Sequence, residues 1–267
     1  ELGVLNMIVI KFGGHAMSDT HGGFAAAISE AVHNGIKIVI VHGGGPQISA
    51  ALDAAAIESE FIGGFRVTTP EIFEIVEQVL AHEVGPAIAN SLLKIGVNAV
   101  EISGRTSESL IAEPLRKLVD GTPADLGLVG VITAVNPQAI RNALKGGQVP
   151  VISPIAIDED FRGGLNVNAD IAAAAIAGAL DASVLIIMTD VAGIYRNWPD
   201  KSSLIEEISA IELSEIKNGF SEGMAPKVQA CLDAIAAGAQ AVRIIDGTDP
   251  KNFALALNNV GGTLVTK

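Results

Sequence analysis

Short apolar runs alternate with longer stretches of helical spacing along most of the chain. The runs cover residues 7–12, 36–41, 97–102, 149–157, 183–188, 241–245 and 262–265. Each is short and mainly apolar, and most have apolar residues on both alternating faces, which is typical of strands that are buried on both sides of a sheet. Helices between such strands favour an α/β fold, in which a mainly parallel sheet is covered on both faces.

The stretches between these runs predict the helices. Apolar residues three and four positions apart indicate helices over residues 18–34, 69–96, 137–144, 171–180, 209–217 and 227–237, and from 250 onward. Ser18 and Asp19 are expected to cap the first helix, Gly35 to end it, and Pro86 to kink or divide the second. Residues 110–135 predict two strands, near 110–115 and 129–135, around a turn, and 61–69 predicts a loop or hairpin.

Two of the predicted strands run directly into glycines. The strand over 36–41 is followed by the glycine triplet 43–45, and Pro46 then opens a helical stretch. Proline suits the first turn of a helix because its missing N–H would have no partner there. Backbone N–H groups at such a turn can bind an anion. The alternative is a tight turn that needs glycine only for its φ angles. A second copy of the pattern, glycines 13–14 after the strand over 7–12, favours the anion site.

The charge of the chain narrows the classes of partner. Seventeen Lys and Arg stand against 30 Asp and Glu, a formal net charge of −13. Such a surface repels nucleic acid and anionic lipid, and no apolar run reaches the roughly 18 residues that span a bilayer. We therefore expect neither nucleic-acid nor membrane partners. No signal peptide opens the chain and Cys231 is the single cysteine, placed for helix packing, so a cytoplasmic protein is expected.

Against this negative charge, four ionisable residues beside turns become candidates for chemistry. Lys11 ends a buried strand, where an ammonium group is costly without an anion unless it reaches solvent at a sheet edge. Lys227 begins a helix after a glycine-bearing loop. Asp170, at another helix start, could hold both lysines or could be an ordinary N-cap. Arg66, beside two glycines, could clamp a substrate carboxylate or could be a solvated surface arginine.

Several common catalytic motifs are absent from the sequence. It contains no Gly-Lys dipeptide for a Walker A loop and no HExxH, and HGGGPQI does not match GxGxxG. The remaining candidate residues are lysines and glycines that suit the binding of a phosphate group. Transfer of a phosphoryl group to an oxygen nucleophile needs positioning and neutralisation of charge, which two lysines and glycine amides could supply.

Seven motifs occur in a specific order: IKFGG (10–14), VHGGGPQI (41–48), GGFRVT (63–68), LNVNAD (165–170), TDVAGIY (189–195), GMAPKV (223–228) and RIIDG (243–247). With these motifs the chain resembles the amino-acid kinase family over residues 7–267, most closely the members that phosphorylate N-acetyl-L-glutamate. The resemblance implies a three-layer αβα sandwich around a mainly parallel open sheet. It also implies an N-terminal lobe (1–173) for amino-acid binding and dimerisation and a C-terminal lobe (174–267) for ATP.

The resemblance also assigns roles to individual positions. Lys11 and Lys227 would stabilise the transferring phosphoryl group, and Asp170 would orient them. Phosphate would contact Gly13, Gly14, Gly43 and Gly44. N-acetyl-L-glutamate would contact Gly44, Gly45, Arg66 and Asn166. The nucleotide would contact Thr189, Asp190, Val191, Gly193, Tyr195, Gly223 and Met224.

The implied reaction is ATP-dependent phosphorylation of the γ-carboxylate of N-acetyl-L-glutamate, which makes an acyl phosphate for arginine biosynthesis. Mg²⁺ would be held mainly by ATP phosphates and water, without a set of protein ligands. Only residues 1–6 precede the first strand, too few for the N-terminal helix of arginine-inhibited hexameric members, so a homodimer is expected. Two alternatives stay open: a sibling kinase for an aminoadipate derivative, and a non-catalytic nucleotide or amino-acid sensor.

Overall fold

The central feature is a sheet of eight strands. The computed structural model describes residues 6–13, 22–118, 121–160, 163–220 and 224–267. The strands of this sheet are β1 (Met7–Phe12), β2 (Lys37–His42), β5 (Ala99–Ser103), β8 (Val149–Ser153), β11 (Val184–Thr189), β12 (Glu207–Ser209), β13 (Ala241–Asp246) and β14 (Thr263–Thr266). Their order is β12-β14-β13-β11-β1-β2-β8-β5, and only the β13–β14 pair is antiparallel. The predicted α/β class with a mainly parallel sheet is confirmed.

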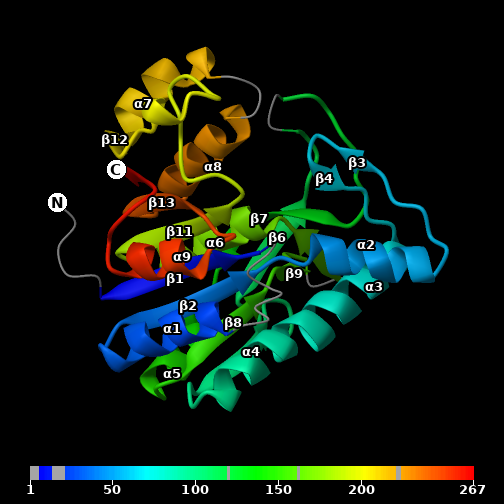
Figure 1. The fold of residues 1–267 in the computed structure, drawn as a ribbon. Coiled ribbons are helices and arrows are strands. Elements are labelled where there is room, and N and C mark those ends of the chain that lie inside the picture. The colour runs from blue at the N-terminus through cyan, green and yellow to red at the C-terminus, as the bar shows by residue number, and fades with distance from the viewer. Residues whose placement is uncertain (1–5, 14–21, 119–120, 161–162, 221–223) are drawn as a thin grey trace.

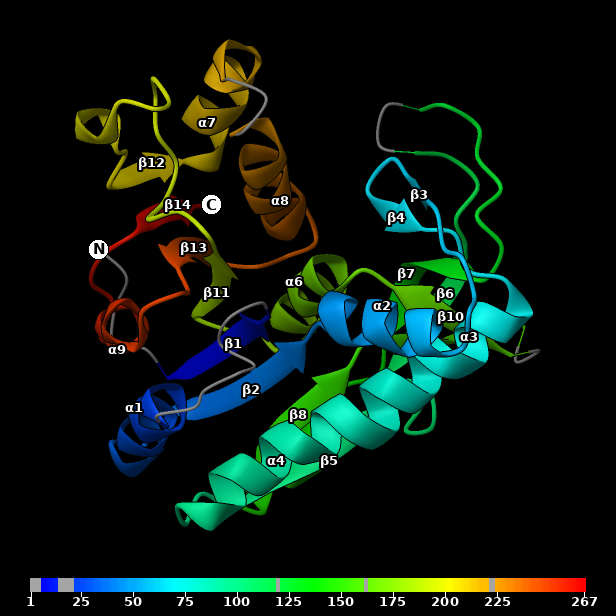
Figure 2. The same cartoon turned by 45° about the vertical axis from the view of Figure 1, so that its right-hand side comes forward.

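Helices cover both faces of this sheet (Figures 1 and 2). One layer contains α1 (Gly23–His33), α4 (Gly85–Lys94) and α9 (Pro250–Leu257), and the other contains α5 (Gln138–Lys145), α6 (Ala169–Ala179) and α8 (Ala225–Ala236). Ile8 and Ile10 of β1 belong to the core under α1, whereas Val9 belongs to the core under α6. Alternate residues therefore meet opposite layers, which explains why the inner strands are mainly apolar on both faces.

The start of α1 corrects one prediction. The helix begins at Gly23, after Gly22 in the left-handed region with φ 69°, and no side chain caps it. The expected caps Ser18 and Asp19 are therefore wrong for this helix, and both lie outside the described residues. A glycine that accepts positive φ can turn the chain into a helix without a side-chain oxygen. The predicted end near residue 34 is confirmed.

Four further strands form a second, closed sheet in the order β10-β7-β6-β9. They are β6 (Leu110–Pro114), β7 (Val129–Val135), β9 (Ile155–Asp158) and β10 (Gly164–Val167). The strands predicted near 110–115 and 129–135 are confirmed. The single strand predicted over 149–157 is wrong, because it is two strands, β8 and β9, in different sheets. Pro154 stands between them and, without an N–H, cannot continue a ladder.

The helical stretch after Thr69 is divided into three parts. Thr69 accepts a hydrogen bond from the N–H of Ile72 and caps α3 (Pro70–Glu77). A π-helical segment, η2 (Gln78–Val84), follows, and Pro86 then lies in the first turn of α4. The predicted division at this proline is confirmed. Pro86 has no N–H and cannot donate the usual helical hydrogen bond, and the wider π-helical turn before it changes the bonding pattern at this point.

The remaining elements complete the frame. The predicted hairpin is formed by β3 (Phe61–Ile62) and β4 (Phe65–Arg66), and α2 (Gly45–Ala54) follows the glycine triplet. Near β12 lie α7 (Ala210–Ile216) and the short 3-10 helices η3 (Lys201–Ser203) and η4 (Lys217–Gly219). Within the described ranges, no helix is long and apolar enough to cross a membrane.

Candidate functional site

A cavity of about 250 Å³ opens where β1 and β2 end and α2 and α6 begin. Ligands bind at such carboxyl ends of parallel strands, as expected from the alternating pattern. The residues predicted for catalysis, phosphate binding and amino-acid binding that line it are Lys11, Gly13, Gly43, Gly44, Gly45, Arg66, Asn166 and Asp170. The structure thus brings together residues that lie far apart in the sequence. Gly14, also predicted here, lies outside the described residues.

Lys11 and Asp170 form an ion pair in this cavity. The Nζ atom of Lys11 lies 3.3 Å from Oδ1 of Asp170. β1 is flanked by β2 and β11, so Lys11 is at the tip of an inner strand and not at a sheet edge. The cap of α6 is Asn168, whose Oδ1 accepts hydrogen bonds from the N–H groups of Asp170 and Ile171. The N-cap alternative for Asp170 is therefore wrong, and its carboxylate is left for Lys11.

Lys227 has a different partner. Its Nζ atom lies 3.2 Å from Oδ1 of Asp190, the residue that follows β11. This hydrogen bond lowers the pKa of the Asp190 carboxyl. Among the residues that the structure describes, Asp170 makes no ion pair with Lys227. α6 packs on α8 and β11 adjoins β1, so the two ion pairs belong to neighbouring elements. The orientation of Lys227 by Asp170 stays a prediction.

The glycine triplet uses its backbone groups unequally. The N–H of Gly43 donates to the carbonyl of Phe12 at 2.9 Å, and the carbonyl of Gly44 accepts from Ile48 at 2.8 Å. The N–H of Gly44 has no partner within the described part of the chain. Of the two triplet amides predicted to bind phosphate, that of Gly43 is thus engaged and that of Gly44 is available.

These glycines are not required by their φ angles. None of the three lies in the left-handed region, and Gly44, with φ 172°, has an extended φ. A Cβ atom at Gly44 would instead lie 2.5 Å from Cδ2 of Leu80, a buried residue of η2. The alternative that the triplet only serves φ is therefore wrong, because lack of space is what demands glycine at 44.

Arg66 lies inside the protein. Its side chain donates hydrogen bonds to Ser59 Oγ at 2.5 Å and Ser49 Oγ at 2.9 Å, and its guanidinium lies over the Phe61 ring. The residue is only 7% exposed, so the surface-arginine alternative is wrong. In the described ranges no carboxylate lies within 4.0 Å of it. Arg66 is thus a buried cation that lines the cavity; the charge of Asp53 acts on it, but no carboxylate of the described ranges is in direct contact with it.

Asn166 is held close to Arg66. It lies on β10, and its Nδ2 donates to Thr68 Oγ1 at 3.1 Å, while Thr68 Oγ1 donates to the carbonyl of Arg66 at 2.8 Å. Sequence reasoning missed Thr68, Ser49 and Ser59 as supports of the site. Hydroxyl side chains are common, and nothing in their spacing signals that they meet Arg66.

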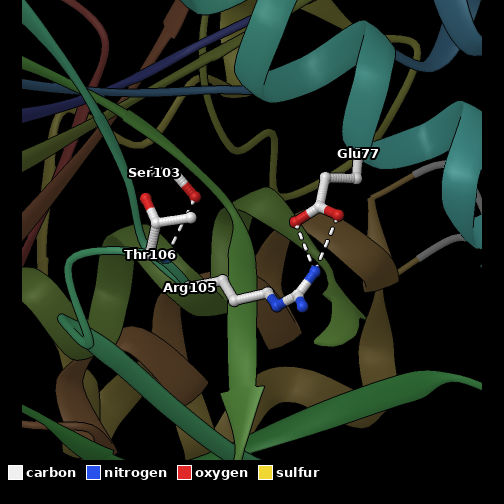
Figure 3. A network of polar contacts seen from close by, with 4 residues as sticks. All are labelled: Glu77, Ser103, Arg105 and Thr106. Carbon is white, nitrogen blue, oxygen red and sulfur yellow. Dashed lines mark hydrogen bonds and ion pairs between the residues drawn. The ribbon is translucent and has the colours of Figure 1, made fainter. Parts of the chain in front are cut away.

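A second arginine fixes the helix that adjoins the cavity (Figure 3). Nη1 of Arg105 donates to both carboxylate oxygens of Glu77, at 2.9 and 2.7 Å. In the same loop the N–H of Thr106 donates to Ser103 Oγ at 3.3 Å. Glu77 is the last residue of α3, directly before η2, so this pair ties the π-helical segment to the loop after β5. Sequence reasoning did not identify it.

The described residues predicted for the nucleotide begin at Thr189, the last residue of β11, and are not in the lining of the cavity. Thr189 Oγ1 accepts a hydrogen bond from the N–H of Val191 at 3.1 Å. A side chain at Gly193 would overlap Thr263. Tyr195 and Met224 are buried, at 6% and 1% exposure. Gly223 lies outside the described residues.

Comparison with known proteins gives the family. The profile of the Amino acid kinase family matches residues 6–246. Acetylglutamate kinase of Arthrobacter sp. (strain FB24) is 46% identical over 262 residues, covering 96% of this chain and 84% of that protein. Acetylglutamate kinase of Leifsonia xyli subsp. xyli (strain CTCB07) is 47% identical over 244 residues, covering 90% and 81%. The crystal structure of smu.665 from Streptococcus mutans UA159 superposes with a TM-score of 0.78 at 29% identity, covering 98% of each chain. The chain belongs to the amino acid kinase family.

Proposed function

We propose that the chain is an acetylglutamate kinase, which transfers the γ-phosphoryl group of ATP to the γ-carboxylate of N-acetyl-L-glutamate in arginine biosynthesis. Two relatives of that name align with nine-tenths or more of the chain. One observation carries the proposal: Arg66, buried and without a carboxylate partner in the described ranges, shares a cavity with the Lys11–Asp170 pair. A buried guanidinium with no carboxylate in direct contact is costly, and a substrate carboxylate would supply that contact.

The amino acid would be oriented by its α-carboxylate. The guanidinium fork of Arg66 suits a bidentate contact with this group. Asn166, fixed through Thr68, would bind the acetamide region together with Gly44 and Gly45. The γ-carboxylate would then point toward Lys11. Because this carboxylate is ionised at neutral pH and is itself the nucleophile, the protein needs no general base.

Lysine side chains and backbone amides would stabilise the phosphoryl group during its transfer. In phosphoryl transfer, negative charge spreads over the equatorial oxygens of the moving group. Lys11 and Lys227 would neutralise this charge, and the amides of Gly13 and Gly44 would donate hydrogen bonds to it. Asp170 would hold the ammonium group of Lys11 in position. The γ-carboxylate oxygen forms the new P–O bond as the bond from phosphorus to ADP breaks, which gives an acyl phosphate and ADP.

The nucleotide would lie over the end of β11 and the start of α8, in reach of Thr189, Asp190 and Lys227. Among the described residues, no group of three or more His, Cys, Asp or Glu could hold a metal ion. We propose that Mg²⁺ arrives on ATP and keeps phosphate oxygens and water as its ligands. When bound, the ion would neutralise charge on the β- and γ-phosphates.

The division of labour along the chain belongs to the same proposal. Residues 1–173, which contain Lys11, Arg66 and Asn166, would bind the amino acid and form a homodimer, and residues 174–267 would bind ATP. One sheet joins the two segments, with β1 beside β11. Light scattering of the purified protein tests the dimer, and cell fractionation tests the cytoplasmic location.

An assay of ADP release with a panel of acceptors tests the function. The acceptors are N-acetyl-L-aspartate, N-acetyl-L-glutamate and N-acetyl-L-aminoadipate, and hydroxylamine traps any acyl phosphate as a hydroxamate. We expect the highest kcat/KM with the glutamate derivative. A higher value with the aminoadipate derivative would overturn the choice of substrate. Binding of ATP without turnover of any acceptor would instead indicate a sensor.

A further inference from the structure

His42, the last residue of β2, lies completely buried behind the glycine triplet. Its exposed fraction is 0%, and its Nδ1 atom lies 2.8 Å from the carbonyl oxygen of Gly43. A carbonyl oxygen only accepts hydrogen bonds, so Nδ1 must carry the proton. The other ring nitrogen, Nε2, is buried and has no hydrogen-bond partner in the described part of the chain. The polar contact of this imidazole is therefore directed to a single atom of the glycine turn.

The surroundings keep the ring neutral and in place. A Cβ atom at Gly85 would lie 3.1 Å from His42 Nε2 and 2.8 Å from Cγ of Glu101, so both side chains pack against this glycine. Burial lowers the pKa of His42 to about 4. At neutral pH the ring thus holds one proton, and it is the proton on Nδ1 that meets Gly43.

The contact fixes one peptide group of the site. The N–H of Gly43 is bound to Phe12, and the carbonyl of Gly44 is bound to Ile48. Between them lies the Gly43–Gly44 peptide, whose carbonyl is held by His42. In a trans peptide the C=O and N–H point in opposite directions. The Gly44 N–H therefore points away from the imidazole, and Gly44 lines the cavity that contains Lys11.

We infer that His42 is a positioning residue for phosphoryl transfer: its Nδ1–H holds the Gly43 carbonyl, which fixes the Gly44 amide in the direction of the transferring phosphate. The inference rests on the proposed kinase function. Glycine peptides rotate easily, and a donor stabilises a transition state best when its direction is set beforehand. The adjoining strand and helix hold the two outer ends of the turn, and His42 holds the peptide between them.

Two substitutions separate the two ring nitrogens. In His42→Asn the amide nitrogen takes the place of Nδ1, whereas in His42→Gln it takes the place of Nε2. We expect His42→Asn to retain most of the wild-type kcat. His42→Gln should lower kcat by about 10- to 100-fold, the scale of a misdirected transition-state contact, with a smaller change in KM for N-acetyl-L-glutamate. Thermal melts of both variants show whether they fold. Wild-type kcat in His42→Gln, or equal losses in both folded variants, would overturn the inference.

A second measurement does not depend on activity. Nitrogen NMR of the wild-type histidine side chains at neutral pH reports which ring nitrogen carries the proton, and loss of one signal pair in a His42 variant assigns it. We expect a protonated Nδ1 and a bare Nε2. A proton on Nε2 would overturn the inference even in an active kinase. The NMR measurement does not need an active enzyme, so it can be interpreted even if no acceptor is phosphorylated. Failure of the inference about His42 and failure of the proposed function can therefore be distinguished.

Discussion

Lys227 pairs with Asp190, at 3.2 Å, while Lys11 pairs with Asp170, at 3.3 Å. Each ammonium group of the proposed phosphoryl site thus has a carboxylate of its own. The side chain of Asp190 is 76% exposed, and ion pairs this open to water contribute little to stability, at most about 1 kcal/mol. Exchange of Asp190 for an ATP phosphate would therefore cost Lys227 little, whereas Lys11 is held more firmly inside the cavity.

Removal of either lysine should affect the chemical step. We expect Lys11→Ala and Lys227→Ala each to lower kcat by roughly 100-fold or more, the scale for loss of one charge-stabilising group, with smaller changes in KM. Steady-state kinetics of ADP release measures this. Lys251→Ala, an exposed lysine on α9, serves as the control and should behave as wild type. A near-normal kcat in either site variant would remove that lysine from the mechanism.

Substitution of Arg66 should act on substrate binding. Arg66→Lys replaces a fork by a point charge and loses contacts to Ser49 and Ser59, so KM for N-acetyl-L-glutamate should rise by about tenfold. KM for ATP should change much less. Arg141→Lys, an exposed residue on α5, is the matched control. If KM for the amino acid stays normal in Arg66→Lys, the carboxylate clamp lies elsewhere.

Gly44→Ala tests the fit between the glycine triplet and the π-helical segment. The new Cβ would lie 2.5 Å from Leu80 Cδ2, so the turn must shift and kcat/KM should fall. Because the conflict is with one side chain, Leu80→Ala in the same protein should restore part of the activity. Kinetics of the two single variants and the double variant give the answer. The absence of any rescue would mean that Gly44 is needed for a reason other than Leu80.

The Glu77–Arg105 pair should contribute to stability. We expect Glu77→Gln to lower the free energy of unfolding by about 1 kcal/mol, because one charge-assisted contact is weakened and both partners are partly exposed. Urea denaturation measures the change, with Glu74→Gln on the exposed side of α3 as the control. Equal stability of the two variants would show that the pair in Figure 3 orders the loop without stabilising the fold.

His42 should make stability depend on pH. Its folded pKa of about 4 lies below the ordinary 6.5, so the unfolded chain binds more protons between these values and stability is lost as the pH falls. At pH 5 this loss amounts to about 2 kcal/mol relative to neutral pH. Glu101, whose pKa is raised by burial, acts in the opposite direction, and the nearby His82 acts on Glu101 by its charge.

The comparison of wild type with His42→Asn at pH 7.5 and pH 5 isolates this term, because both proteins keep Glu101 and His82. Chemical denaturation at the two pH values gives the free energies. The wild type should lose more stability than the variant on acidification. The same loss in both proteins would mean that His42 is protonated in the folded state as easily as in the unfolded chain.

Much of the fold could be predicted because buried parallel strands have a clear pattern. The runs that became β1, β2, β11 and β13 are apolar on both faces, and no other element shares that signature at that length. β10 and β12 are short and polar in part, so their pairing is decided by tertiary contacts that the pattern does not contain. The start of α1 could not be predicted from side-chain caps, because Gly22 turns the chain there without one.

The parts of the candidate site that could be predicted are those for which a few neighbouring residues in the sequence carry the signal. Glycines beside strand ends, and Lys11 at the tip of a buried strand, signal an anion through the local sequence alone. The partner of Lys227 could not be predicted, since Asp190 and Lys227 meet only when α8 packs beside the end of β11. The role suggested for His42 likewise depends on which ring nitrogen meets Gly43, and a sequence does not contain that information.

The place of β1 in the sheet matters while the chain is being made. β1 pairs with β2, which begins at Lys37, and with β11, which begins only at Val184. Until that point leaves the ribosome, one edge of an apolar strand stays unpaired and open to association with other chains. The strand that contains Lys11 thus keeps one unpaired edge from the completion of β2 until β11 emerges, and growing chains are open to mispairing in that interval.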